Sequence, residues 1–76
     1  MPKYYGLVVR EERSEPWCFE FGSFDRSDVQ FERDCYRSSH KASNLMVVVF
    51  AECPDASGVN EYLRELNQHL TQDPIK

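Results

Sequence analysis

The sequence predicts an α+β domain: a two-layer sandwich in which a three-stranded sheet carries two helices on one face, in the order β-β-α-β-α. Three apolar segments have strand patterns, two amphipathic segments have helical spacing, and the connections between them are short and polar. With 76 residues, of which 41% are hydrophobic and 29% charged, the chain has the size and composition of one small domain over residues 1–76. A two-domain enzyme is excluded.

The first two strands are expected to form an antiparallel hairpin. Residues 3–12 are rich in β-forming side chains, and residues 17–22 alternate between apolar and polar positions. The loop at residues 13–15 between them is polar, as in a turn. The second strand should therefore have one buried aromatic face, formed by Trp17, Phe19 and Phe21.

The first helix is predicted over residues 26–38. Asp25 or Ser27 can cap it, because a short polar side chain accepts a hydrogen bond from a free N–H group at the helix start. At about 100° per residue, one group of apolar side chains projects together and should face the sheet. This group consists of Phe24, Phe31 and Cys35, with Val29 and Tyr36 to one side of it.

Glu32 interrupts the apolar face of this helix. It falls between the two apolar groups, near the middle of the face that should meet the sheet. A buried carboxylate is costly unless it is paired or hydrogen-bonded. Glu32 is therefore either a buried structural group that holds the helix on the sheet or a general base. We favour the structural role, because buried polar groups are usually satisfied and no second catalytic group is evident.

The apolar run at residues 45–52 predicts a third strand that is buried on both faces. Residues 59–72 have the spacing of a second amphipathic helix, after a turn signal at residues 54–58. A strand–helix–strand crossover makes the third strand parallel to the second and is expected to leave both helices on one face. We favour the first strand as the central strand, and the second strand in that position stays open.

The charge balance excludes some ligands. Thirteen acidic against nine basic residues give a formal charge of −4, whereas binding a phosphate backbone needs a dense basic surface. No nucleic acid partner is therefore expected, and arginines interrupt the acidic residues too often for a DNA mimic. The apolar runs are too short for a signal peptide or a membrane span, so no membrane partner is expected either.

The cysteines indicate reduced thiols. Cys18, Cys35 and Cys53 are odd in number and form no C-x-x-C pair, which favours a cytoplasmic location. A nucleophilic pair of Cys35 with His40 is an alternative, but a cysteine on an apolar helix face acts as a small hydrophobic group. Metal ligands at short spacing and the common nucleotide or hydrolase motifs do not occur, so we expect no metal, no cofactor and no enzymatic activity.

Two surfaces are candidates for binding a protein partner. The outer face of the first helix is expected to carry Arg26, Arg33 and Arg37. Arginine pairs well with carboxylates, so this face suits an acidic partner. The sheet face that the helices leave uncovered is expected to carry Leu45, Val47 and Val49. A homodimer would cover this apolar face.

Residues 17–34 carry the pattern W-x-x-x-F-G-x-[FY]-D-R-x-x-V-x-x-E. This segment resembles small orphan proteins encoded by phages and other mobile elements. The matching positions are mostly structural, so the resemblance implies a shared fold more than a shared site. It also implies a protein that binds and modulates host proteins, including inhibitors of defence systems such as CRISPR.

The function expected from these observations is that of a small cytoplasmic protein-binding module without catalysis, a phage-type inhibitor or modulator of a host or defence protein. A self-associating, homodimeric structural domain is the first alternative. A small enzyme that uses Glu32 or a cysteine is the second.

Overall fold

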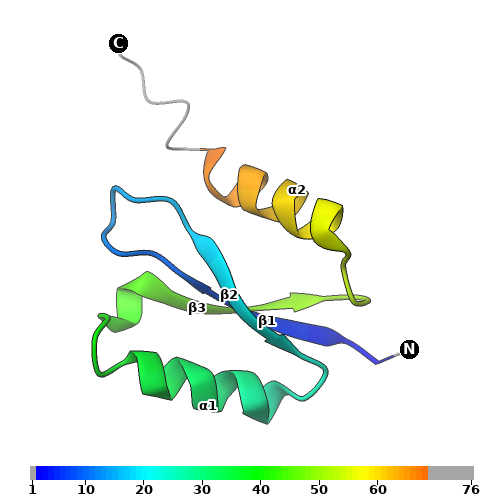
Figure 1. Cartoon of the computed structure of the whole chain (residues 1–76), viewed down its shortest axis with the longest axis horizontal. Coiled ribbons are helices and arrows are strands. Elements are labelled where there is room, and N and C mark those ends of the chain that lie inside the picture. Colours follow the sequence, from blue (N-terminus) through cyan, green and yellow to red (C-terminus); the bar gives the residue numbers. More distant parts are fainter. Residues whose placement is uncertain (1, 69–76) are drawn as a thin grey trace.

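The computed structural model describes residues 2–68 of the chain. Its elements follow in the predicted order (Figure 1): β1 (Tyr4–Val9), β2 (Cys18–Ser23), α1 (Arg26–Tyr36), the short 3-10 helix η1 (Ala42–Asn44), β3 (Leu45–Phe50) and α2 (Ala56–Leu66). The α+β class is confirmed. The part of the second predicted helix beyond residue 68 lies outside the described residues.

β1 is the central strand of the sheet. The strand order is β2-β1-β3, and β1 pairs antiparallel with both neighbours. The favoured central position of the first strand is therefore confirmed. β2 and β3 run in the same direction on either side of β1, as a crossover through α1 requires.

The two helices cover opposite faces of the sheet (Figure 1). Leu7 and Val9 face α1, whereas Val8, Trp17 and Val48 form a second cluster on the side of α2. The predicted two-layer sandwich with both helices on one face is therefore wrong. The handedness of the crossover determines only the face on which α1 lies. The chain after β3 can place α2 on either face of the sheet. Helix α2 covers the face that would otherwise expose Val8 and Val48, because burying apolar surface contributes about 25 cal/mol per Å².

A bulge in β2 decides which face its aromatic side chains meet. The β1–β2 register shifts so that Leu7 pairs with Phe21 and Val8 pairs with Phe19, which leaves Glu20 as the extra residue. Phe21 consequently packs on the side of α1 and Phe19 on the side of α2. In a regular strand both would face the same side. The predicted single aromatic face of the second strand is wrong for this reason.

α1 also turns a different face to the sheet from the predicted one. Val29 is fully buried, whereas Phe24 is 55% and Phe31 67% exposed, and Cys35 is exposed as well. Aromatic side chains of the sheet, including the ring of Phe21, already fill the layer beneath the helix. A small β-branched side chain fits against them, and the two phenylalanines of the predicted face point to solvent.

α2 is held at both ends by hydrogen bonds. Asp55 caps its start, where the carboxylate accepts the N–H of Gly58 at 2.7 Å. At its other end, the Asn67 side chain accepts the N–H of Trp17 at 2.8 Å and donates to the carbonyl oxygen of Trp17 at 3.2 Å. All of α2 is described, and none of its residues is fully buried. The two bonds to Trp17 therefore contribute strongly to docking this helix on the sheet.

Candidate protein-binding surface

The outer side of α1 carries an apolar surface that we call the α1 stripe, formed by Phe31 and Cys35. At about 100° per residue, these positions lie roughly 200–240° from the buried Val29, on the opposite side of the helix. Phe24 precedes the helix and lies outside the stripe, and its ring is held edge-on against the ring of Tyr4 of β1, with the two centroids 4.9 Å apart. Phe31 is the most exposed of the large apolar side chains in the described residues, at 67%.

A polar network fixes the start of α1 and so positions Phe24. The Asp25 carboxylate accepts the N–H of Ser27 at 3.0 Å and its hydroxyl at 2.7 Å. These two hydrogen bonds lower the pKa of Asp25 from its ordinary value. Ser23 Oγ accepts the N–H of Asp25 at 3.0 Å and donates to the carboxylate of Asp28 at 3.2 Å. Of the two predicted caps, Asp25 and Ser27, the structure uses Asp25, and Phe24, which was predicted to face the sheet with Phe31, is 55% exposed.

The three predicted arginines lie on the flank of α1 that slopes toward the sheet. At about 100° per residue they fall within roughly 80° of Val29, so the outer face belongs to the α1 stripe instead. Arg33 is half-buried, and its Nε is buried with no hydrogen-bond partner among residues 2–68. Its Nη2 lies 3.3 Å from the carboxylate of Asp34. Arg26 and Arg37 are exposed and remain free to meet a partner at the edge of the stripe.

The sheet face that was expected to stay open is covered within the chain. Leu45 is buried and Val47 half-buried in the cluster beneath α1. Only Val49 of the three predicted side chains is largely exposed, at 49%. The argument for a homodimer that covers an open sheet face is therefore wrong, because a helix lies on each face.

Glu32 lies beside a tyrosine hydroxyl at the sheet-facing flank of α1. It is half-buried, and its charge contributes to raising the pKa of Tyr36. Burial is the largest cause of that increase, followed by the charge of Glu20 and by the hydrogen bond that Tyr36 donates to Glu20 at 3.3 Å. The charges of Glu20 and Glu32 both act on Tyr36 and favour the neutral phenol.

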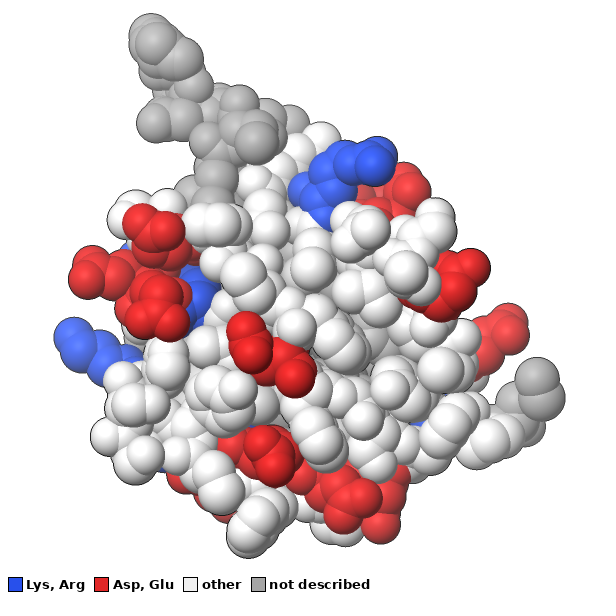
Figure 2. Space-filling model, viewed as in Figure 1, with Lys and Arg blue, Asp and Glu red and all other residues white. Residues whose placement is uncertain are grey.

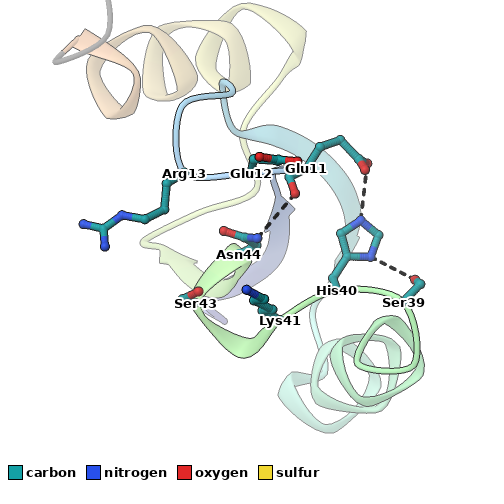
Figure 3. A pocket seen from close by; sticks show the side chains of 8 residues that line it. All are labelled: Glu11, Glu12, Arg13, Ser39, His40, Lys41, Ser43 and Asn44. Carbon is teal, nitrogen blue, oxygen red and sulfur yellow. Dashed lines mark hydrogen bonds and ion pairs between the residues drawn. The ribbon is translucent and has the colours of Figure 1, made fainter.

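A polar cavity of about 450 Å³ lies between the loop after β1 and the segment that joins α1 to β3 (Figure 3). On its wall, His40 Nε2 lies 3.3 Å from the carboxylate of Glu11, and His40 Nδ1 lies 2.9 Å from Ser39 Oγ. The Asn44 side chain donates to the carbonyl oxygen of Glu11 at 3.4 Å and accepts from Arg10 Nε at 3.0 Å. These contacts connect the hairpin loop to the segment after α1.

Ser39, His40 and Glu11 have the residue types of a nucleophile, a base and an orienting acid. The N–H groups of Ser39 and His40 both donate to the carbonyl oxygen of Tyr36, at 3.0 and 2.9 Å. Neither can therefore stabilise an oxyanion, which such a reaction needs. This cluster has no local signal in the sequence, because Glu11 and His40 are 29 residues apart. His40 contacts these side chains and the ring of Tyr36, whereas Cys35 lies on the α1 stripe.

The charged side chains leave broad uncharged areas on the surface. In Figure 2, carboxylates are spread around such an area, and Lys and Arg side chains appear at few places. Within residues 2–68, no group of cysteine, histidine and acidic side chains is arranged to hold a metal ion. In the same residues no helix is long and apolar enough to cross a membrane. All three cysteines are free and exposed.

The fold and this surface define a small α+β domain that displays one large aromatic side chain, Phe31, on the outer face of a helix. Comparisons of the chain with protein-family models, with curated proteins and with solved structures find no match.

Proposed function

We propose that this chain is a protein-binding module that works without catalysis and that the α1 stripe forms the centre of its binding surface. The observation that carries the proposal is the exposure of Phe31, 67% on the outer side of a regular helix. A phenylalanine side chain of about 200 Å² would lose roughly 130 Å² of exposed surface against a partner, a gross gain of about 3 kcal/mol. A few such aromatic anchors dominate the affinity of many protein interfaces.

The charges beside the α1 stripe specify the chemistry of the partner. Asp28 and Asp34 are exposed on either side of Phe31, whereas Arg26 and Arg37 lie further round the helix. A partner with an apolar groove and basic groups at its rim fits the stripe. An acidic group on the partner would meet the arginines only at the edge of the contact, where charges act mainly on the association rate.

The resemblance of residues 17–34 to small phage and mobile-element proteins supports a partner in a bacterial host, such as a defence protein of the CRISPR type. Three free, exposed thiols are compatible with action in the reducing cytoplasm. This part of the proposal concerns the identity of the partner and is separate from the surface that binds it.

A pull-down from bacterial lysate tests the binding surface. The bait is the purified chain, compared with Phe31→Gln and with the control Arg64→Gln, which changes an exposed residue paired with Glu61 on α2. A partner retained by the wild type and the control, and lost by Phe31→Gln, supports the α1 stripe. A partner that Phe31→Gln still retains excludes the stripe, and Arg37→Glu then tests the arginine flank. Absence of any partner contradicts the function.

Self-association is a second candidate function, because one edge of the sheet is unprotected. β3 is an edge strand, and its segment Leu45–Phe50 contains no charged residue and no proline. Such strands pair readily with other strands.

A further inference from the structure

The free backbone groups of β3 can be assigned from its register with β1. The N–H of Arg10 donates to the carbonyl oxygen of Asn44 at 3.0 Å, which continues the β1–β3 ladder by one pair. Residue pairs in an antiparallel ladder alternate between bonded and non-bonded. The carbonyl oxygen of Asn44 and the backbone groups of Met46 and Val48 therefore face β1, and the residues between them turn their backbone groups outward. We call the outward groups of Leu45, Val47 and Val49 the β3 edge.

The β3 edge has no paired strand within residues 2–68. The N–H of Leu45 is already used, because it donates to the carbonyl oxygen of Ala42 in η1. The carbonyl oxygen of Leu45 and both backbone groups of Val47 and Val49 remain to be paired. The side chain of Val49, 49% exposed, lies beside these groups and would be covered by any strand that paired with them.

The two edges of the sheet differ in their protection. β2 carries the bulge and the exposed residues Cys18 and Glu20, which are features that prevent pairing with another strand. β3 pairs with β1 in one continuous register and has only apolar side chains. The β3 edge is therefore the one suited to strand addition.

We infer that the β3 edge pairs with the β3 edge of a second copy of this chain, antiparallel and centred on Val47. This register exchanges two bonds between Val47 and the second copy's Val47, and it directs the N–H of each Val49 to the carbonyl oxygen of the opposite Leu45. This register does not use the N–H of Leu45, which already donates to the carbonyl oxygen of Ala42. The pairing joins the two sheets into one, with strand order β2-β1-β3-β3-β1-β2.

The charges next to the strand favour this orientation and a second copy as the occupant. Lys41 precedes η1 and Glu52 follows β3, and both are exposed. In antiparallel pairing the start of one β3 meets the end of the other, so Lys41 of each chain lies at the same end of the paired strands as Glu52 of the second copy. A parallel pair would instead bring Lys41 toward Lys41 and Glu52 toward Glu52. Each chain thus carries at its two strand ends the charges that complement a second copy.

This inference rests on the second candidate function and specifies its interface. Sedimentation equilibrium of the full chain from micromolar to submillimolar concentration tests it, with Val49→Lys as the disrupting variant. Cys18→Lys is the matched control, because it adds the same charge at an exposed position of the other sheet edge. We expect a wild-type dimer, an unchanged dimer for Cys18→Lys, and a dissociation constant raised at least about tenfold for Val49→Lys. Circular dichroism verifies that all three chains are folded.

The register has its own test. The double variant Lys41→Glu/Glu52→Lys preserves the charge pairing and should dimerise like the wild type, whereas either single variant should dissociate more easily at low salt. A wild-type chain that stays monomeric, or a Val49→Lys chain that dimerises fully, overturns the inference. If Phe31→Gln dissociates the dimer and Val49→Lys does not, the contact uses the α1 stripe instead. A monomeric wild type leaves the pull-down with the α1 stripe unaffected, so the failures of the two proposals are distinguishable.

Discussion

The orientation of α1 can be tested by comparing two substitutions that are two residues apart. Val29→Ala removes two methyl groups from a side chain with 0% exposure. At about 0.8 kcal/mol per buried carbon, plus the cost of the cavity, this should lower the free energy of unfolding by about 2 kcal/mol. A chain of this length is expected to have a total stability of only roughly 4–11 kcal/mol, so the loss is a large fraction of it.

Phe31→Gln should have a much smaller effect. With 67% of Phe31 exposed, about one third of a side chain of roughly 200 Å² is covered, and the glutamine stem retains part of this contact. Glutamine also has a better helix propensity than phenylalanine. The expected loss is below about 1 kcal/mol, less than half of the effect of Val29→Ala.

Thermal and urea unfolding followed by circular dichroism measure both effects. Each kcal/mol corresponds to roughly 4–8 °C in the melting temperature of a domain of this size, so Val29→Ala should melt about 8–16 °C below the wild type. The reverse order, with Phe31→Gln the more damaging change, would show that Phe31 lies in the core. In that case the α1 stripe would not exist as a surface, and the proposed function would lose its main support.

Three further predictions concern α2, the tyrosines and the thiols. Asn67→Ala should lower the free energy of unfolding by about 1–3 kcal/mol, because it removes two hydrogen bonds to the backbone of Trp17. The control is Asn60→Ala, at an exposed position of the same helix. Equal effects of the two substitutions would contradict the anchoring role of Asn67. Burial raises the pKa of Tyr36 and of Tyr62 above the ordinary value of 10.0. Their contribution to stability is therefore complete below about pH 10 and lost as the pH rises through the folded-state pKa values. In a spectrophotometric titration, two tyrosines of the folded chain should ionise at higher pH than the tyrosines of the unfolded chain. Identical titrations of the folded and unfolded chains would refute this prediction. All three thiols should react with a thiol reagent at the rate of the unfolded chain, because all are exposed, and a slow thiol would contradict that exposure.

The order of the elements could be predicted from the sequence because each element has a local signal. The β1–β2 hairpin, the cap at Asp25 and the apolar β3 segment all depend on residues close together in the chain. The central position of β1 was favoured by the crossover rule. The strands before and after the crossover, β2 and β3, both pair with β1. Element bounds differ from the prediction by only a few residues where the structure describes them.

The faces of the elements could not be predicted, because they depend on contacts between distant residues. The bulge at Glu20 is visible only in the pairing of β2 with β1, and it sends Phe19 and Phe21 to opposite sides. On α1, two apolar groups competed for the sheet, and hydrophobicity alone favours the larger one with Phe31. The space between the helix and the sheet fits the small side chain of Val29, so the face with Val29 packs against the sheet. Because Phe31 and Cys35 were predicted to face the sheet, the sequence did not indicate the α1 stripe.

The two proposed surfaces together would make the dimer bivalent. A two-fold axis between antiparallel β3 strands runs perpendicular to the joined sheet, so both α1 helices would lie on the same face with their stripes directed the same way. A partner immobilised at high density could then bind both stripes at once, which raises the apparent affinity without any new contact. We expect Val49→Lys to weaken binding to such a surface by more than tenfold and to leave binding to the dissolved partner unchanged. Equal effects in the two formats would mean that the stripes do not act together.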